Sequence, residues 1–232
     1  MLIAGRQVTS ELMDDPSLDP VAHRAALRGL ANINSFTHSS DVLGRRIRSY
    51  AKNRAQPLRV LDVACGGGDV TVALQQHVNR EGLDIRLHGC DISPTALQHA
   101  RQNASDSGVE IDFFRLDVLN EPIPTGYDII VSSLFFHHLS NEQAESLLRN
   151  LCAATTCVLI SDLERLWIGH VAAWLGARFL SRSPVVHFDG PASVRAAFSK
   201  AELKALAEKA GLCDARVCRW WPFRLLLEWS KL

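Results

Sequence analysis

Short apolar runs alternate with helical patterns of apolar and polar positions from residue 58 to the C-terminus. Apolar runs of this length, bounded by turn residues, are typical of buried strands. Strands are expected at 59–64, 85–90, 111–115, 127–133, 157–161, 214–220 and 223–230. Helices are expected at about 69–79, after Ser93-Pro94, from the capping box at Ser140 to about Leu151, and from the capping box at Ser199 to Gly211. Strands that alternate with helices predict an α/β fold, with helices on both faces of a parallel sheet.

The last two expected strands are separated only by Trp221-Pro222. A crossover to a parallel neighbour takes a dozen or more residues, so this pair must be antiparallel. The expected fold is therefore a Rossmann-like, seven-stranded, mainly parallel sheet with one antiparallel strand.

Two segments lie outside this alternating pattern. Before it, helices at about 20–33 and 40–54 predict a helical cap over residues 1–54, followed by one domain over 55–232. Within that domain, residues at about 164–198 form an insertion that is long for such a connection. We expect it to be a lid; a helix that packs over the sheet edge is the alternative. Its first part has helical spacing, whereas 182–198 contains proline and glycine and is expected to be a loop. Acceptor contacts are expected from this insertion, at Trp167, His187 and Arg195.

The composition is that of a folded protein without a polyanionic partner. The 232 residues include 25 basic and 25 acidic side chains, and 47% are hydrophobic. Binding to nucleic acid needs a basic excess, which this chain lacks. No stretch approaches the roughly 18 apolar residues of a membrane span, and no secretory signal is found. The six cysteines include no Cys-x-x-Cys pair and no Cys/His cluster at zinc spacing, so we expect reduced thiols, no metal and a cytoplasmic location.

Three consecutive glycines, Gly66 to Gly68, follow the first expected strand of the sheet. Ligands bind to such sheets at the carboxyl ends of the strands, and glycine lets a ligand approach the backbone closely. A dinucleotide fingerprint fails, because the sixth position counted from Gly66 is Thr71. A phosphate-binding loop fails as well, because Asp69-Val70 follows the glycines. A nucleoside without phosphates is the ligand class that remains.

Three acidic residues stand at or just beyond strand ends beside this turn. These are Asp62, Asp91 and Asp117. A carboxylate after the second strand can accept hydrogen bonds from ribose hydroxyls, and one after the third can accept from an adenine amine. Ile92 and Val118 follow two of them and are placed to sandwich the base.

The segments VLDVACGGGDV, GCDIS, RLDV and YDIIVSSLFFHHL occur in this order. Over residues 55–165 the chain resembles the class I S-adenosylmethionine-dependent methyltransferases, most closely the small-molecule branch with the ubiquinone and menaquinone biosynthesis enzymes. The resemblance implies S-adenosyl-L-methionine as the cofactor. It also implies that Gly66 and Gly68 pack against the methionine part, Asp62 orients the amino group, Asp91 holds the ribose, and Asp117 with Val118 holds the adenine. Ala64 replaces the first glycine of the commonest pattern, and Ala64, Ile92 and Ser133 are further expected cofactor contacts.

Methyl transfer to a phenol is assisted by a base that generates the phenolate. His137 and His138 follow the fourth strand, whose end borders the methyl group in this family, so either is a candidate base. A structural role in the turn is the alternative for both. Ser132-Ser133-Leu134-Phe135 replaces the Asn/Asp-Pro-Pro-Tyr/Phe motif of enzymes that methylate amino groups of DNA bases or glutamine.

These features predict a methyltransferase that acts on oxygen of a small apolar phenol or quinol. Carbon methylation of a similar ring and an inactive, cofactor-binding scaffold of a biosynthetic complex are the alternatives. The expected partner is the small-molecule acceptor, with no nucleic acid and no stable membrane insertion, and the expected state is a monomer or homodimer. The C-terminal RWWPFRLLLEWSKL is expected to form an edge hairpin; a peripheral membrane contact is the alternative.

Overall fold

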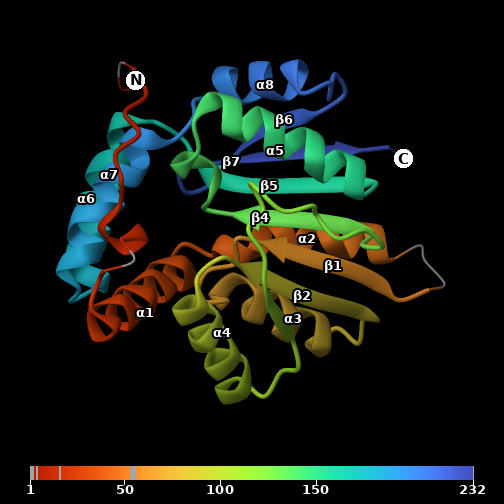
Figure 1. Ribbon diagram of the computed structural model, residues 1–232, viewed down its shortest axis with the longest axis horizontal. Coiled ribbons are helices and arrows are strands. Elements are labelled where there is room, and N and C mark those ends of the chain that lie inside the picture. Colours follow the sequence, from red (N-terminus) through yellow and green to blue (C-terminus); the bar gives the residue numbers. More distant parts are fainter. Residues whose placement is uncertain (1–2, 4, 16, 53–55, 232) are drawn as a thin grey trace.

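The computed structural model describes residues 3, 5–15, 17–52 and 56–231. Seven strands form one sheet in the order β3-β2-β1-β4-β5-β7-β6 (Figure 1). They are β1 (Leu58–Val63), β2 (Ile85–Asp91), β3 (Asp112–Arg115), β4 (Ile129–Ser133), β5 (Cys157–Leu163), β6 (Arg216–Trp220) and β7 (Arg224–Ser230). Only β7 runs antiparallel to its two neighbours, β5 and β6. The predicted α/β sheet with one reversed strand is therefore confirmed.

The α-helices are α1 (Pro20–Phe36), α2 (Ser39–Ala51), α3 (Asp69–Arg80), α4 (Pro94–Asp106), α5 (Asn141–Ala154), α6 (Trp167–Leu180), α7 (Pro184–Ala196) and α8 (Lys200–Lys209). Two short 3-10 helices are η1 (Leu12–Asp14) and η2 (Phe136–His138). Helices α1, α4, α5 and α8 begin after residues whose side chains cap them. The Asp19 carboxylate accepts hydrogen bonds from the first amides of α1, and Ser140 and Ser199 form the predicted capping boxes.

The core has two halves, one on each face of the sheet. Helices α5 and α8 pack on one face, where the leucines at 147, 148, 151, 203 and 206 meet alternate residues of the strands. Helices α2 and α3 pack on the other face, where Val42, Leu43 and Ile47 of α2 join the core. Helix α2 was expected in the N-terminal cap, and its apolar face is part of the sheet's core. The expected end of this helix at Arg54, and the expected boundary between 54 and 55, lie outside the described residues, and the division into cap and domain stays a prediction.

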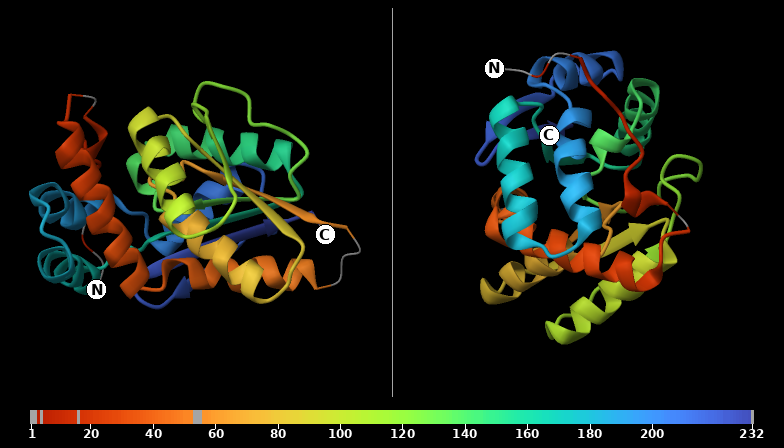
Figure 2. Two further views of the ribbon diagram at one scale, coloured as in Figure 1. Left: turned by 90° about the horizontal axis from the view of Figure 1, so that it is seen from below. Right: turned by 90° about the vertical axis from the view of Figure 1, so that its left-hand side faces the viewer.

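A separate layer stands at the carboxyl ends of the parallel strands, on the left in Figure 1. It consists of α1, α6, α7 and the N-terminal strap, as we call residues 5–15; the right panel of Figure 2 views the molecule from this end. Helix α7 packs against α6 and α1, where Val185 and Val186 are buried with Ala26 and Ala177. In the part of the chain that the structure describes, no helix is long and apolar enough to cross a membrane.

The expectation of a loop over 182–198 is wrong, because residues 184–196 form α7. Pro184 takes the first helical position, where a missing N–H costs nothing, but Pro191 lies inside the helix. The proline and glycine residues of this segment favour a loop. Burial of its side chains against α1 and α6 outweighs that local preference and stabilises a helix. Pro191 is itself buried, and the side chain of His170 donates a hydrogen bond of 3.0 Å to its carbonyl oxygen.

Gly68 lies in the turn before α3, where the chain is tightly packed against α4. It has a φ of 71°, and a β-carbon there would lie 2.8 Å from Cβ of Ala100. Gly82 has a similar φ of 62° with no atom within 4 Å of such a β-carbon. We expect Gly82→Ala to lower the free energy of unfolding by about 1 kcal/mol through backbone strain, and Gly68→Ala by about 2–4 kcal/mol because overpacking adds to that strain. Urea denaturation of the two variants measures the difference, and equal losses would contradict the packing argument.

Candidate active site

One cavity of about 1520 Å³ lies at the carboxyl ends of the strands, beneath the end layer. Typical small-molecule sites have about 300–1,000 Å³, so there is room for two ligands side by side. One part of its wall is polar and comes from the strand ends, including Asp62, Gly66 and Asp91. Another part is largely apolar and comes from α1, α6 and the turn between β6 and β7, including Leu27, Ala173 and Phe223.

The glycine turn after β1 presents its backbone to the cavity. Ala64, Gly66 and Gly68 all have positive φ, of 54°, 55° and 71°. A β-carbon on Gly66 would meet nothing within 4 Å, whereas one on Gly67 would lie 2.9 Å from His99. The glycines therefore differ in purpose. Gly66 leaves open space for a ligand, while Gly67 and Gly68 allow α4 to approach.

Asp91 fixes the position of this turn from the end of β2. Its carboxylate accepts hydrogen bonds from the backbone N–H of Gly66 and of Ser93, both at 2.8 Å. Burial raises the pKa of Asp91. A carboxylate oxygen has two lone pairs, so both oxygens keep capacity to accept from a ligand in the cavity.

Three buried polar atoms on the cavity wall have no hydrogen-bond partner among the described residues. They are Oδ1 of Asp62, Oγ of Ser133 and Nη1 of Arg224. Buried polar atoms are nearly always paired in folded proteins, so unpaired ones that face a cavity indicate ligand contacts. The three supply an acidic acceptor, a hydroxyl and a cationic donor, which suits a ligand with both an ammonium and a carboxylate group.

Asp62 and Arg224 are each held by a hydroxyl group, and burial shifts the pKa of each. The hydroxyl of Thr71 donates to Oδ2 of Asp62 at 2.6 Å, and burial raises the pKa of this carboxyl to about 7. Nη2 of Arg224 donates to the Ser39 hydroxyl at 2.6 Å, and burial lowers the pKa of the guanidinium to about 10. Because β7 is reversed, its first residue pairs with Leu163 at the end of β5 and so reaches the same edge of the sheet.

The predicted adenine contacts also line the cavity. Ile92 is 53% exposed, and Val118 is buried. Asp117 accepts hydrogen bonds from the backbone N–H of Leu119 and the side chain of Asn120, and the latter bond lowers its pKa. Asp62, Ala64, Gly66, Asp91 and Ser133 line the cavity as well, so eight of the nine predicted cofactor contacts line it, and Gly68 does not.

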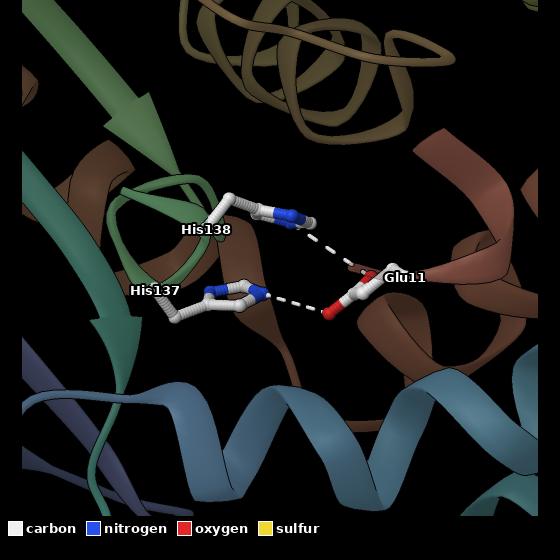
Figure 3. Close-up of side chains that lie close together, drawn as sticks. All are labelled: Glu11, His137 and His138. Carbon is white, nitrogen blue, oxygen red and sulfur yellow. Dashed lines mark ion pairs between the residues drawn. The ribbon is translucent and has the colours of Figure 1, made fainter. Parts of the chain in front are cut away.

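His137 and His138 lie on η2, side by side, with ring centroids 4.3 Å apart. Nδ1 of His137 donates to Asp162 at 2.7 Å, and Nδ1 of His138 lies 2.9 Å from the carboxylate of Asp14. Both Nε2 atoms face Glu11, at 3.5 Å for His137 and 3.9 Å for His138 (Figure 3). Burial disfavours the charged form of His137, but Asp162 and Glu11 outweigh it and raise its pKa to about 10.

The N-terminal strap closes one side of the cavity. Arg6 donates to the carbonyl oxygens of His137 and Leu139, at 2.9 and 2.6 Å. The Asp189 carboxylate accepts from the backbone N–H of Leu12 and Met13, at 2.8 and 3.1 Å. These bonds hold Glu11 against the two histidines.

Four residues of the site were not predicted from the sequence: Glu11, Asp14, Asp162 and Arg224. Asp162 had a signal, because it belongs to the end of a parallel strand like Asp62 and Asp91. Glu11 and Asp14 had none, because they lie in a polar segment without periodicity.

The predicted acceptor contacts lie away from the cavity. Trp167, His187 and Arg195 are not among the residues that line it. Trp167 is 48% exposed at the start of α6. Nε2 of His187 donates a hydrogen bond to the carbonyl oxygen of Ser181 at 2.8 Å. Asp189, in the same segment, is the residue that reaches the strap.

One known protein family matches the stretch that supplies most of the polar wall of the cavity. Residues 60–156 match the family described as a methyltransferase domain. The matched stretch runs from β1 through β4 to α5 and includes the glycine turn, Asp91 and the two histidines. The end layer and the β6–β7 hairpin lie outside the match.

Curated and solved relatives agree on the domain and the fold. A stretch of 94 residues is 35% identical to the ribosomal RNA small subunit methyltransferase C of Escherichia coli K12, and covers 39% of this chain but only 26% of that protein. The plantazolicin methyltransferase in complex with a substrate analogue and S-adenosylhomocysteine has a TM-score of 0.68 at 15% identity, over 94% of this chain and 91% of that one. An O-methyltransferase family 2 protein of Planctomyces limnophilus in complex with apigenin has a TM-score of 0.64 at 18% identity, over 94% and 63%. The resemblance to class I S-adenosylmethionine-dependent methyltransferases is confirmed, while the quinone branch stays a prediction.

The attachment of the strap can be tested at Asp189. In Asp189→Asn only one oxygen remains to accept from Leu12 and Met13, and the new NH₂ group faces an N–H donor. Leaving one buried donor unpaired costs about 1–3 kcal/mol, so amide exchange in residues 7–15 should accelerate by about 10- to 100-fold. Hydrogen–deuterium exchange measured by mass spectrometry tests this, with the exposed Asp106→Asn as a control. Unchanged exchange in the strap would show that Asp189 does not anchor it.

Proposed function

We propose that this protein transfers a methyl group from S-adenosyl-L-methionine to a small apolar acceptor, with oxygen on a phenol or quinol ring as the target. The observation that carries the proposal is the large cavity, which joins a polar wall at the strand ends to an apolar wall from α1, α6 and the turn between β6 and β7.

The polar wall suits each part of the cofactor. Asp62 and Arg224 offer an unpaired acceptor and an unpaired donor for the ammonium and carboxylate of its methionine part. Asp91 accepts from the ribose hydroxyls, while Ile92, Asp117 and Val118 surround the adenine. Gly66 permits close approach to the backbone. When bound, the cofactor supplies an electrophilic methyl group on a sulfonium.

The apolar wall suits a hydrophobic acceptor. Helix α1 contributes Leu27, Leu30 and Ile33, and α6 contributes small residues such as Ala173 and Gly176. Small side chains on α6 widen the cavity, and the apolar surface favours burial of a ring or alkyl chain. Apigenin, the ligand of the Planctomyces limnophilus relative, is itself a phenol.

The two histidines are not equivalent as candidate bases. His137 is buried, with a carboxylate near each ring nitrogen, and its pKa of about 10 keeps it protonated at neutral pH. His138 is partly exposed and lines the cavity, and Asp14 holds its Nδ1, while its Nε2 lies 3.9 Å from Glu11, beyond hydrogen-bond distance. His138 is therefore the better candidate to accept a proton from the acceptor, and His137 positions the turn.

The remaining proposals concern the class of acceptor, the location and the oligomeric state. The acceptor is a small molecule rather than a nucleic acid, because the chain has no net charge. We keep the cytoplasm as the proposed location and a monomer or homodimer as the proposed state.

The activity is tested with isotope-labelled S-adenosylmethionine and a panel of alkylated phenols and hydroquinones. Asp91→Asn should lower the affinity for S-adenosylhomocysteine at least tenfold, because it removes a charged acceptor of ribose hydrogen bonds. Titration calorimetry measures the affinity. The exposed Asp112→Asn, on the neighbouring strand β3, should bind like the wild type. Equal affinity of Asp91→Asn and wild type, or no label transfer to any member of the panel, would count against the proposal.

The raised pKa of Asp62 predicts a pH dependence of cofactor binding. Its carboxyl has a pKa of about 7, so it is protonated below that pH and a carboxylate above it. The ammonium group of the ligand favours the carboxylate. Affinity for S-adenosylhomocysteine should therefore rise about tenfold from about pH 6 to about pH 8. In Asp62→Asn the dependence should disappear together with much of the affinity. A wild-type affinity that is flat over this range would contradict the role of Asp62.

A further inference from the structure

Glu11, His137 and His138 form a cluster that the proposed methyl transfer does not need in full. Among the described residues, these three make up the group of histidine, cysteine and acidic side chains that is close enough to hold a metal ion, with ligand atoms within 4.8 Å of one another. Glu11 and His137 are buried, and His138 is partly exposed toward the cavity.

The distances in the cluster are long for hydrogen bonds and suitable for a shared ion. The Nε2–carboxylate distances are 3.5 Å from His137 and 3.9 Å from His138. A hydrogen bond between nitrogen and oxygen is about 2.7–3.2 Å long. Two ligands that each lie about 2.0–2.2 Å from one ion are at most about 4.3 Å apart. Both measured nitrogen–oxygen distances are below this limit, so each histidine can share one ion with Glu11.

The second ring nitrogen of each histidine is held in the way typical of metal ligands. Asp162 accepts from Nδ1 of His137 at 2.7 Å, and Asp14 lies 2.9 Å from Nδ1 of His138. Histidines that bind metals almost always donate their other N–H to such an acceptor, which fixes the tautomer and the direction of the ring. Here this arrangement occurs twice, and it points Nε2 of both rings toward the carboxylate of Glu11 (Figure 3). Because His137 is protonated at neutral pH, its Nε2 would release a proton to water when the ion binds.

Glu11 is also fixed in place. The hydroxyl of Ser193 donates to its Oε1, and the strap on either side is bonded through Arg6 and Asp189. The second carboxylate oxygen, Oε2, is the one that faces His138. A buried carboxylate in a rigid segment, opposite two oriented imidazoles, is a ligand set that is assembled before an ion arrives.

We propose that Glu11, His137 and His138 bind one divalent transition-metal ion, with Zn²⁺ favoured by the ligand set, at the wall of the cavity. Two histidines and one carboxylate with an open position form typical catalytic zinc sites. The open position faces the cavity, and there, if the proposed function holds, the hydroxyl oxygen of the acceptor coordinates.

The chemistry balances without a further reagent. Coordination lowers the pKa of the acceptor hydroxyl, and its proton leaves to water. The oxygen lone pair then forms the bond to the methyl carbon while the carbon–sulfur bond breaks. Its electron pair remains on sulfur, which turns the sulfonium into a neutral thioether. In this arrangement His138 is a ligand, and deprotonation occurs on the metal-bound oxygen instead of through a histidine base.

The test measures metal binding directly, with Zn²⁺ and the spectroscopic probe Co²⁺. The samples are the full-length wild type, Glu11→Gln, His138→Ala and the control His88→Ala, whose histidine lies on β2 and contacts Tyr127. We expect one Zn²⁺ per chain in the wild type and in His88→Ala. Affinity should fall at least about hundredfold in Glu11→Gln and His138→Ala, since each loses a direct ligand and even the loss of an outer partner costs about 10- to 100-fold. Co²⁺ should give visible bands of a four- or five-coordinate site in the wild type and lose them in both ligand variants.

Melting temperatures without metal show whether the variants fold. His138 is partly exposed, so His138→Ala carries the test even if Glu11→Gln loosens the strap. Zinc affinity that is equal in wild type and His138→Ala, or lost equally in His88→Ala, would overturn the proposal.

Titration of the same samples with S-adenosylhomocysteine separates the two proposals. If S-adenosylhomocysteine binds and zinc does not, the metal site is wrong and the proposed function stands. If zinc binds with the expected variant pattern and S-adenosylhomocysteine does not, the metal site stands and the proposed function is wrong.

Discussion

The arrangement of this protein depends on parallel pairing in the middle of the sheet. Because β1, β2, β4 and β5 run in the same direction, their carboxyl ends meet at one edge. Asp62 and Asp91 come from different strands and line the same cavity for this reason, and Asp162 at the end of β5 bonds His137, which also lines it. The reversed strand β7 adds Arg224, because its first residue pairs with the end of β5. Arg224 thereby places a cationic group at the edge of the sheet where Asp62 and Asp91 lie.

The second organising feature is the closure of this edge by residues from the start of the chain. The strap approaches α7 and η2, which lie more than a hundred residues away in the sequence, and is bonded through Arg6 and Asp189. Burial of charged groups is costly unless they are paired, so these contacts form a connected set. Burial raises the pKa of Asp189 to about 6, and two backbone amides compensate its charge. The polar network at the mouth of the cavity places Glu11 where it faces both histidines.

Much of the site was predictable because strand ends are recognisable. The glycine turn, Asp62, Asp91 and Asp117 follow apolar runs whose direction the helix–strand alternation implies, so their convergence followed from pattern alone. Helix α7 was not predictable, because Pro191 and Gly190 argue for a loop and only its burial against α1 and α6 favours a helix. The acceptor contacts expected at His187 and Arg195 rested on the same expectation of a loop. Trp167 lies in the part that was expected to be helical, and none of the three residues lines the cavity. Residues 182–198 were treated as a loop over the site, whereas α7 turns Asp189 toward the strap.

By itself, the sequence determined the succession of strands and of the helices other than α7, the reversed strand, and the glycine turn and acids at the strand ends. These features rest on local periodicity, capping residues and strand ends, which act over a few residues. Only the tertiary structure decided that Glu11, Asp14 and Asp162 surround the two histidines, and that Arg224 reaches the cavity. These contacts join residues that lie up to about 190 positions apart. The stability of these contacts depends on burial and on pairing of charges. A local sequence pattern carries no information about either.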